Sequence, residues 1–218
     1  RERTFVADAA HELRTPISAL KVHADNACHA GDENEREASQ QLLTASVQRV
    51  ERLVAQLLSL SRAESTGRVV ARTRLDLAAL AGIEIDAARP LLDARGQTLH
   101  LDLKPVLVSG DEIALGLLVR NLVENAARYA PTGATVEVRT WKADGRAFLS
   151  VDDSGPGIPD DERERVFDRV YRRLGSRHEG SGLGLAIVKS VVEAHGGQVF
   201  ARNAPGGGAE LGFEVPVV

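Results

Sequence analysis

A short stretch near the start of the chain places a titratable nucleophile in a helix. His11 is followed by Glu12, and Thr15 and Pro16 come one turn later. Apolar and small residues recur at helical intervals through residues 5–20, which predicts an amphipathic helix with His11 and Thr15 on one face. Because Pro16 cannot donate a hydrogen bond to the carbonyl of Glu12, we expect a bend that opens the surface around His11. Taken alone, the stretch also fits an ordinary helical histidine on a solvated face.

A second group of functional side chains is spaced for a single helix face. Asn121 and Asn125 are one turn apart, and Arg128 and Tyr129 follow by another turn. Amide oxygens suit Mg²⁺, a guanidinium suits phosphate, and an aromatic ring can pack on a base. The pattern therefore indicates a nucleotide-binding face, with a polar stripe facing solvent as the alternative.

A carboxylate and two glycines follow an apolar run at residues 151–159. Asp153 could accept a hydrogen bond from an exocyclic amine such as that of adenine, and Gly155 and Gly157 would let a flat ligand approach the backbone. As a bare motif this is also a simple turn.

Three alternate glycines, Gly180, Gly182 and Gly184, open a predicted helix. Glycines before a helix N-terminus expose backbone N–H groups to a phosphate, and the helix dipole favours the anion. A dinucleotide fold is excluded, because the glycines follow a long polar loop and not the first strand of a βαβ unit. The preceding basic stretch, residues 167–179 with Arg172, fits a lid over phosphates or a plain solvated loop.

The order of these motifs resembles that of the transmitter core of two-component sensor histidine kinases, and the resemblance covers essentially the whole chain. It implies an α+β chain: a helical hairpin that forms a dimeric four-helix bundle, followed by an α/β sandwich of the Bergerat type found in Hsp90, gyrase and MutL. It also implies ATP and Mg²⁺ as cofactors.

The resemblance implies roles for particular residues. His11 would be the phospho-acceptor, Glu12 the neighbouring base, and Thr15 would orient water for dephosphorylating a partner. Asn125, helped by Asn121, would hold Mg²⁺. The residues implied to contact the nucleotide are Asn121, Asn125, Arg128, Tyr129, Asp153, Gly155, Gly157, Arg172, Gly180, Gly182 and Gly184.

The implied activity is autophosphorylation of His11 by ATP, followed by transfer to an aspartate of a response-regulator receiver domain. Regulator phosphatase activity, a homodimer, and a parent protein in the bacterial inner membrane with this part in the cytoplasm are implied as well. Two rival functions remain open: a Bergerat-fold ATPase or switch that does not phosphorylate itself, and a phosphatase-biased scaffold.

We expect a hairpin domain over residues 1–65, a linker over 66–73 and an ATP-binding domain over 74–218. The first hairpin helix is expected to end near Ala30 and the second to span about Glu35–Ser65. Its mostly apolar positions form a coiled-coil-like seam: Leu43, Val47, Val50, Val54, Leu57 and Leu60 or Ser61. A second copy would cover this thin core, and docking of the hairpin on its own second domain is the alternative.

Within residues 74–218 the pattern mixes helices and strands without regular strand–helix–strand alternation, which predicts a layered α+β sandwich and not a doubly wound sheet. Helices are expected over about 75–95 (after a short strand), 111–129, 160–167 and 183–195. Strands are expected over 98–103, 106–109, 135–141, 146–152, 198–203 and 209–215.

Composition excludes several classes. The chain has 218 residues and a formal net charge of −4, which gives no reason to expect nucleic-acid binding. Its one cysteine, Cys28, excludes an internal disulfide framework, and we expect it to be a small buried hydrophobe, with a reactive thiol as the alternative. No apolar run reaches the length of a membrane span, so membrane contact would come only through segments absent from this sequence, which contains no methionine and is expected to be a fragment.

Overall fold

The computed structural model describes residues 16–64, 72–168, 171, 183–204 and 206–218. The chain divides into two compact units, Arg1–Leu58 and Ser59–Val218, each of which is described by itself. The predicted boundary at residue 65 lies between this division and the first strand, which begins at Thr73. The domain limits therefore stay predictions.

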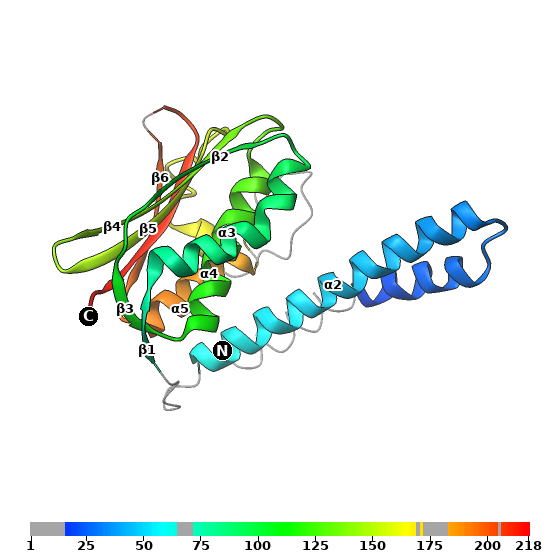
Figure 1. The fold of residues 1–218 in the computed structure, drawn as a ribbon, viewed down its shortest axis with the longest axis horizontal. Coiled ribbons are helices and arrows are strands. Elements are labelled where there is room, and N and C mark those ends of the chain that lie inside the picture. The colour runs from blue at the N-terminus through cyan, green and yellow to red at the C-terminus, as the bar shows by residue number, and fades with distance from the viewer. Residues whose placement is uncertain (1–15, 65–71, 169–170, 172–182, 205) are drawn as a thin grey trace. The chain divides into compact units, whose positions relative to one another are not determined.

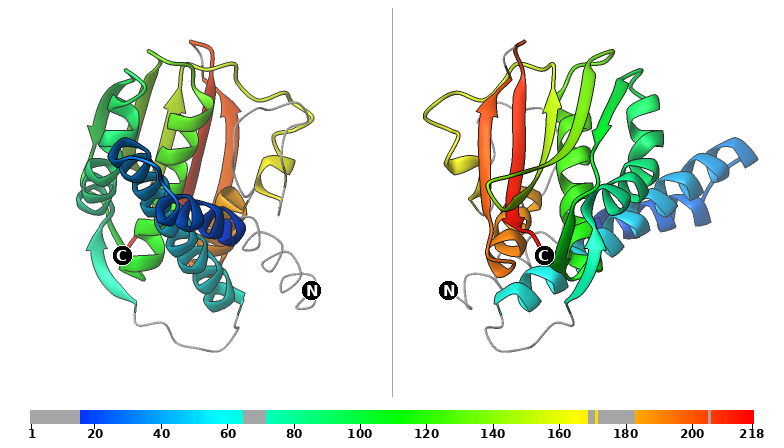
Figure 2. Two further views of the ribbon diagram at one scale, coloured as in Figure 1. Left: turned by 90° about the vertical axis from the view of Figure 1, so that its right-hand side faces the viewer. Right: turned by 60° about the vertical axis from the view of Figure 1, so that its left-hand side comes forward.

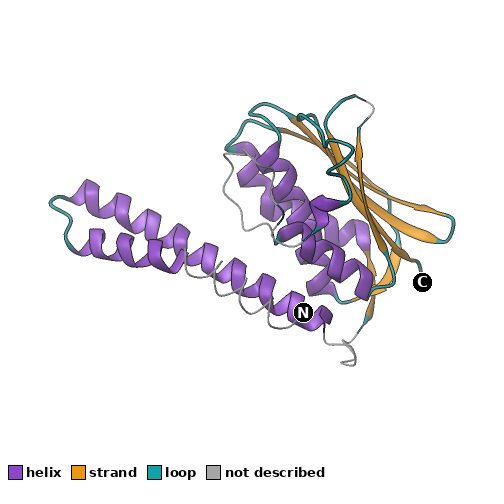
Figure 3. Ribbon diagram, turned by 180° about the vertical axis from the view of Figure 1, so that it is seen from behind, coloured by secondary structure: helices purple, strands orange, loops and turns teal. Residues whose placement is uncertain are grey.

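A helical hairpin makes up the described part of the first unit, and its second helix continues past Leu58. Residues 16–28 are helical, and α2 (Glu33–Glu64) runs back alongside them (Figures 1 and 3). In the turn, Asp32 Oδ1 accepts the Glu35 N–H at 2.8 Å, and Glu35 Oε2 accepts the Gly31 N–H at 2.9 Å. This pair of reciprocal bonds caps the helix, so α2 begins two residues earlier than predicted.

Part of the predicted seam is open to solvent in the single chain. Val47 and Val54 on α2 are each 41% exposed, and Val22 on the preceding helix is 54% exposed. The prediction that Cys28 is buried is wrong, because it lies exposed at the end of its helix. A lone hairpin has too little packed surface to cover its apolar side chains.

The second unit is built on a five-stranded sheet in the order β2-β4-β5-β7-β6. Its strands are β2 (Thr98–Leu103), β4 (Thr135–Ala143), β5 (Arg146–Asp153), β6 (Gln198–Asn203) and β7 (Ala209–Pro216). β2 pairs with β4 in parallel and the other pairs are antiparallel. A separate antiparallel ribbon joins β1 (Thr73–Asp76) to β3 (Leu107–Gly110).

Three helices cover one face of this sheet: α3 (Leu77–Asp93), α4 (Glu112–Tyr129) and α5 (Gly184–Ala194) (Figures 1 and 2). The core lies between the layers and includes large apolar side chains that are fully buried, among them Ile85 on α3, Leu118 on α4, Leu149 on β5, Ile187 on α5 and Phe213 on β7. Asp76 fixes one corner, since its Oδ1 accepts the N–H groups of Ala78 and Val106, both at 3.0 Å. The predicted α+β sandwich is confirmed.

One predicted helix is wrong. Residues 160–164 form turns, and the only helical residues there are the short 3₁₀ turn η1 (Arg165–Phe167). The segment is almost entirely charged, and Phe167 is its one buried side chain. A short helix in water needs an apolar face packed on the protein to be stable, and this segment has none. Among the described helices, none is long and apolar enough to span a membrane.

Candidate functional site

The second half of α4 carries the four side chains that were predicted to share a face. Asn121 is 7% exposed, and its Nδ2 donates to the carbonyl of Leu117 at 2.9 Å. Asn125, Arg128 and Tyr129 follow on the same helix. This hydrogen bond uses the amide nitrogen of Asn121 and joins the side chain to the preceding turn of α4.

The start of α5 meets this face of α4. A Cβ added to Gly184 would lie 3.1 Å from Asn121 Oδ1. The absence of a side chain at Gly184 therefore lets the glycine end of α5 approach the asparagine closely. Two motifs far apart in the sequence are neighbours in the fold.

Asp153 ends β5 and is buried, with 7% of its surface exposed. Its Oδ1 accepts the N–H of Gly155 at 2.8 Å and the N–H of Ala209 at 3.4 Å. Burial raises the pKa of Asp153, against the lowering effect of these two hydrogen bonds. In the described part of the chain both bonds end on Oδ1, so Oδ2 is the oxygen available to a ligand N–H.

Glycines after Asp153 keep the space around it clear. A Cβ on Gly155 would lie 2.6 Å from Asp153 Oδ1, and Gly157 has φ +71° with its added Cβ 2.9 Å from Asn203 Oδ1. Asn203 Oδ1 also accepts the N–H of Ile158 at 2.8 Å. The buried acceptor and its glycine surroundings fit a flat ligand with an exocyclic amine, as the adenine of ATP has.

Two residues of this arrangement were missed from the sequence. Gly208 has φ +93°, and a Cβ there would overlap the carbonyl oxygen of Asp153. Asn203 ends β6 and holds the backbone of the Gly157 loop. The run Gly206-Gly207-Gly208 between two predicted strands was the available signal, since three successive glycines point to an unusual backbone path.

These three glycines make a matched series for stability. Gly206→Ala is expected to change the free energy of unfolding by less than about 0.5 kcal/mol, because nothing lies within 4 Å of the added Cβ. Gly207→Ala, at φ +89° with open space, should cost about 1–2 kcal/mol from backbone strain alone. Gly208→Ala adds a steric clash worth about 1–3 kcal/mol to similar strain. Denaturant unfolding measures all three, and equal losses at Gly207 and Gly208 would contradict the close approach to Asp153.

Asp152, the neighbour of Asp153, faces the other side of the sheet. Arg139 Nη2 lies 2.6 Å from Asp152 Oδ2 and 3.3 Å from Glu210 Oε1. The pKa of Asp152 is raised to about 6, chiefly by burial and further by Glu210, while Arg139 opposes the shift. The guanidinium of Arg139 thus pairs with two largely buried carboxylates. A negative charge on Asp152 therefore lowers the stability of the folded protein.

Asp152→Asn is therefore expected to stabilise the protein near pH 8. The pKa of Asp152 in the folded state, about 6, lies above the ordinary value of 3.8. Between these two pH values the folded state keeps the proton that the unfolded state has lost, so the protein loses stability as pH rises through this range. Allowing for solvent screening, we expect a gain of about 1 kcal/mol at pH 8. At pH 4 the advantage should vanish. Unfolding curves at the two pH values measure the effect, and a variant less stable than wild type at pH 8 would contradict it.

The remaining predicted site residues lie outside the described residues. They are His11, Glu12, Thr15, Arg172, Gly180 and Gly182. Within the described ranges, no group of three or more His, Cys, Asp or Glu side chains could hold a metal ion. The described site therefore consists of one face of α4, the start of α5, and the end of β5 with its glycine loop.

Family models match both parts of the chain. Residues 110–218 match the model described as histidine kinase-, DNA gyrase B-, and HSP90-like ATPase, the class of ATP-binding protein that this sandwich and site define. Residues 1–66 match the His Kinase A (phospho-acceptor) domain. The chain belongs to the sensor histidine kinases of two-component systems, and the two matches correspond to their transmitter core.

Individual relatives agree with this assignment. Sensor protein QseC of Salmonella typhi is 40% identical over 223 residues, covering 100% of this chain and 47% of the relative. Sensor protein kinase PmrB of Pseudomonas aeruginosa is 37% identical, covering 99% of this chain and 46% of the relative. The structure of the mycobacterial sensor histidine kinase MprB is similar with a TM-score of 0.61 and 34% identity, over 67% of this chain and 97% of that one. The chain spans about half the length of the curated relatives it matches.

Proposed function

We propose that this chain is the catalytic core of a protein-histidine kinase that phosphorylates its own His11 from ATP and passes the phosphoryl group to an aspartate of a response-regulator receiver domain. The observation that carries the proposal is the buried carboxylate of Asp153, held by two backbone N–H groups and surrounded by glycines, in a chain that also matches a phospho-acceptor domain. A nucleotide site and an acceptor histidine in one chain are what autophosphorylation requires.

The binding roles follow from the chemistry of the side chains. Asp153 Oδ2 accepts the exocyclic N–H of adenine, and Gly155 and Gly157 give the base room against the backbone. The α4 face lies toward the phosphates, where the guanidinium of Arg128 binds phosphate oxygens. Tyr129 packs by the base, and the basic lid with Arg172 and the glycines Gly180, Gly182 and Gly184 enclose the phosphates.

We propose Asn125, with Asn121, as the protein ligands of Mg²⁺. When bound, Mg²⁺ neutralises charge on the phosphates. Amide oxygens suit this hard cation, and a Mg²⁺ bound mainly by phosphates and water needs few protein ligands.

The transfer step uses the hairpin. Glu12 accepts a hydrogen bond from one nitrogen of the His11 imidazole, and the other nitrogen attacks the γ-phosphorus in line. The N–P bond forms as the bond to the β-phosphate oxygen breaks, and ADP leaves with the electron pair. The receiver aspartate later takes the phosphoryl group from His11. Thr15 orients the water that dephosphorylates the partner when the protein acts as its phosphatase.

The active assembly is a homodimer in this proposal. The exposed valines Val47 and Val54 on α2 lie at seam positions that a second hairpin would cover in a four-helix bundle. We further propose that the parent protein lies in the bacterial inner membrane with this part in the cytoplasm; the support is that relatives about twice as long as this chain are named sensor proteins.

The direct test is to incubate the chain with γ-labelled ATP and Mg²⁺ and follow the label. We expect a phosphoramidate, recognised by label that is stable to base and lost in acid, and its transfer to an added receiver domain. ATP turnover without labelling of the chain would favour the plain ATPase. Phosphate removal from a receiver without any labelling would favour the phosphatase-biased scaffold.

A further inference from the structure

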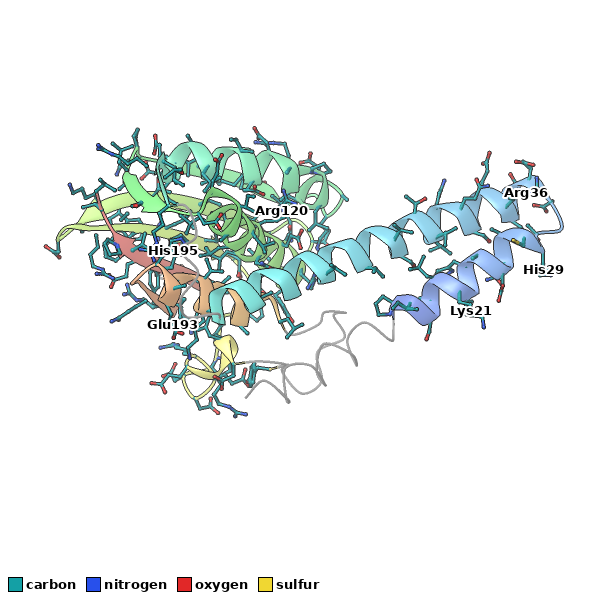
Figure 4. The ribbon with its side chains drawn as sticks, turned by 90° about the horizontal axis from the view of Figure 1, so that it is seen from below. Lys21, His29, Arg36, Arg120, Glu193 and His195 are labelled. Carbon is teal, nitrogen blue, oxygen red and sulfur yellow. The ribbon has the colours of Figure 1, made fainter. Side chains whose placement is uncertain are left out.

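A buried histidine ties the end of α5 to the start of α4. His195 directly follows α5 and is 9% exposed (Figure 4 labels it). Its Nδ1 lies 2.7 Å from the carbonyl oxygen of Val191, and its Nε2 lies 3.1 Å from the N of Asp111, the N-cap of α4. One tautomer satisfies both contacts: Nδ1–H donates to the carbonyl while Nε2 accepts the Asp111 N–H.

The corner around this ring has no spare room. A Cβ added to Gly110 would lie 2.5 Å from Leu115 Cδ1 and 3.1 Å from His195 Nε2. Asp111 is held from its other side as well, since its Oδ1 accepts the N–H groups of Ile113 at 2.9 Å and Ala114 at 3.1 Å. The ring therefore contacts a backbone corner that cannot shift independently of α4.

Both ends of α5 contact α4, and the two contacts are separated by nearly the same length along each helix. From His195 back to Gly184 is eleven residues, and from Asp111 forward to Asn121 is ten. At 1.5 Å per residue these spans are about 16.5 Å and about 15 Å. The helices run antiparallel, with the His195–Asp111 contact at one end and the Gly184–Asn121 approach at the other. Any slide of α5 along α4 would break the first contact and displace the second together.

We propose that His195 is a positioning residue for nucleotide binding, which acts by keeping Gly184 against Asn121 through the register of α5 on α4. The inference rests on the proposed nucleotide role of the α4 face. The neutral ring is essential to it, because a proton on Nε2 would place an N–H donor against the Asp111 N–H. Nucleotide affinity should therefore depend on the protonation of a residue that does not touch the nucleotide.

The charged groups around the ring define the direction of this dependence. They are Arg72 before β1, which donates to the carbonyl of Ala194, Asp111 at the corner, Glu193 on α5, and Arg146 of β5, which donates to the carbonyl of Gly196. Burial lowers the pKa of His195, Arg72 lowers it further, and the Val191 carbonyl and Asp111 act against them. The ring therefore stays neutral at pH 7–8 and gains its proton only below the ordinary value of 6.5.

The linkage has a definite sign. Since the folded pKa lies below 6.5, the unfolded chain takes up the proton first, and stability falls as pH drops below 6.5. Nucleotide affinity in the folded protein falls at lower pH still, where the native ring is protonated. The loss of stability and the loss of nucleotide affinity are both expected only below about pH 6.5, and neither is expected between pH 7 and 8.

The test compares His195→Gln and His195→Ala in the 218-residue chain, with His100→Gln, an exposed histidine on β2, as the control. A glutamine amide oxygen can accept the Asp111 N–H without titrating. We measure the dissociation constant of Mg-ADP from pH 8 to pH 5.5, with unfolding curves at each pH to confirm that each variant is folded.

At pH 8 we expect His195→Gln within about threefold of wild type and His195→Ala about five- to twentyfold weaker, as for loss of one buried hydrogen bond. On acidification wild type and the His100 control should weaken relative to His195→Gln. At each pH, the ratio of the dissociation constants of wild type and His195→Gln cancels the titration of the nucleotide and of the groups that both proteins share.

A folded His195→Ala with wild-type affinity, or a His195→Gln that loses affinity in acid as wild type does, would overturn the inference. Should the alanine variant fail to fold, the pH profile of the glutamine variant decides alone. Absence of Mg-ADP binding to wild type at every pH would instead overturn the proposed nucleotide function.

Discussion

The His11→Gln variant, incubated with γ-labelled ATP and Mg²⁺, is expected to stay unlabelled while the wild-type chain becomes labelled. A glutamine amide has no nucleophilic lone pair comparable to that of imidazole, so the N–P bond cannot form. Loss should be complete within detection, whereas binding of ATP should be unchanged because the substitution leaves residues 74–218 intact. Acid-labile, base-stable label on the wild type and none on the variant is the expected result.

His29→Gln is the matched control for this substitution. His29 is exposed and directly follows the helix that ends at Cys28, and its Nδ1 contacts the carbonyl oxygen of Asp25 at 2.8 Å. Labelling of this variant should equal that of wild type. Persistent labelling of His11→Gln, or acid-stable label on serine or threonine, would contradict the assignment of the acceptor.

The second large effect is expected at Asp153. In Asp153→Asn the amide oxygen can keep the N–H bonds of Gly155 and Ala209, which places the NH₂ group where the second carboxylate oxygen lies. Two donors then face each other when adenine binds, and we expect ATP affinity to fall about 10- to 100-fold, the cost of an unsatisfied buried donor. The KM for ATP should rise, with a smaller change in the rate at saturating ATP. Equilibrium binding of Mg-ATP measures the loss.

Asp152→Asn provides a control one residue away. It makes the same chemical change on the opposite face of β5, where the partner is Arg139. ATP affinity should stay within about twofold of wild type, because the side chain points away from the glycine loop. Equal losses in the two variants would mean that damage to β5, and not loss of an acceptor, weakens binding.

Local patterns in the sequence were sufficient for most of the elements. The strands over 98–103 and 198–203 and the end of α4 at Tyr129 agree with expectation, because alternation and helical spacing report which face is buried. The helix predicted over residues 160–167 is wrong because local preference and burial disagree there. Charged residues there favour a helix by intrinsic preference, but no apolar face packs it onto the core.

Whether a single side chain is buried depends on which other residues pack against it in the fold. Cys28 was expected inside because cysteine is usually buried, yet it lies exposed at the end of its helix. Residue type gives an average tendency, and the position of a residue relative to its neighbours in space decides the individual case.

The sequence by itself determined the class of protein, the order of the motifs and the identity of the chemical groups: a histidine with a neighbouring carboxylate, amides on one helix face, a strand-end carboxylate and glycines. These are properties of residues close in the chain. Only the tertiary structure decided that Gly184 lies against Asn121, that Gly208 closes on Asp153, and that His195 holds Asp111. Each of these contacts joins residues far apart in the chain, where the packing of helices on the sheet, and not local spacing, sets the distance.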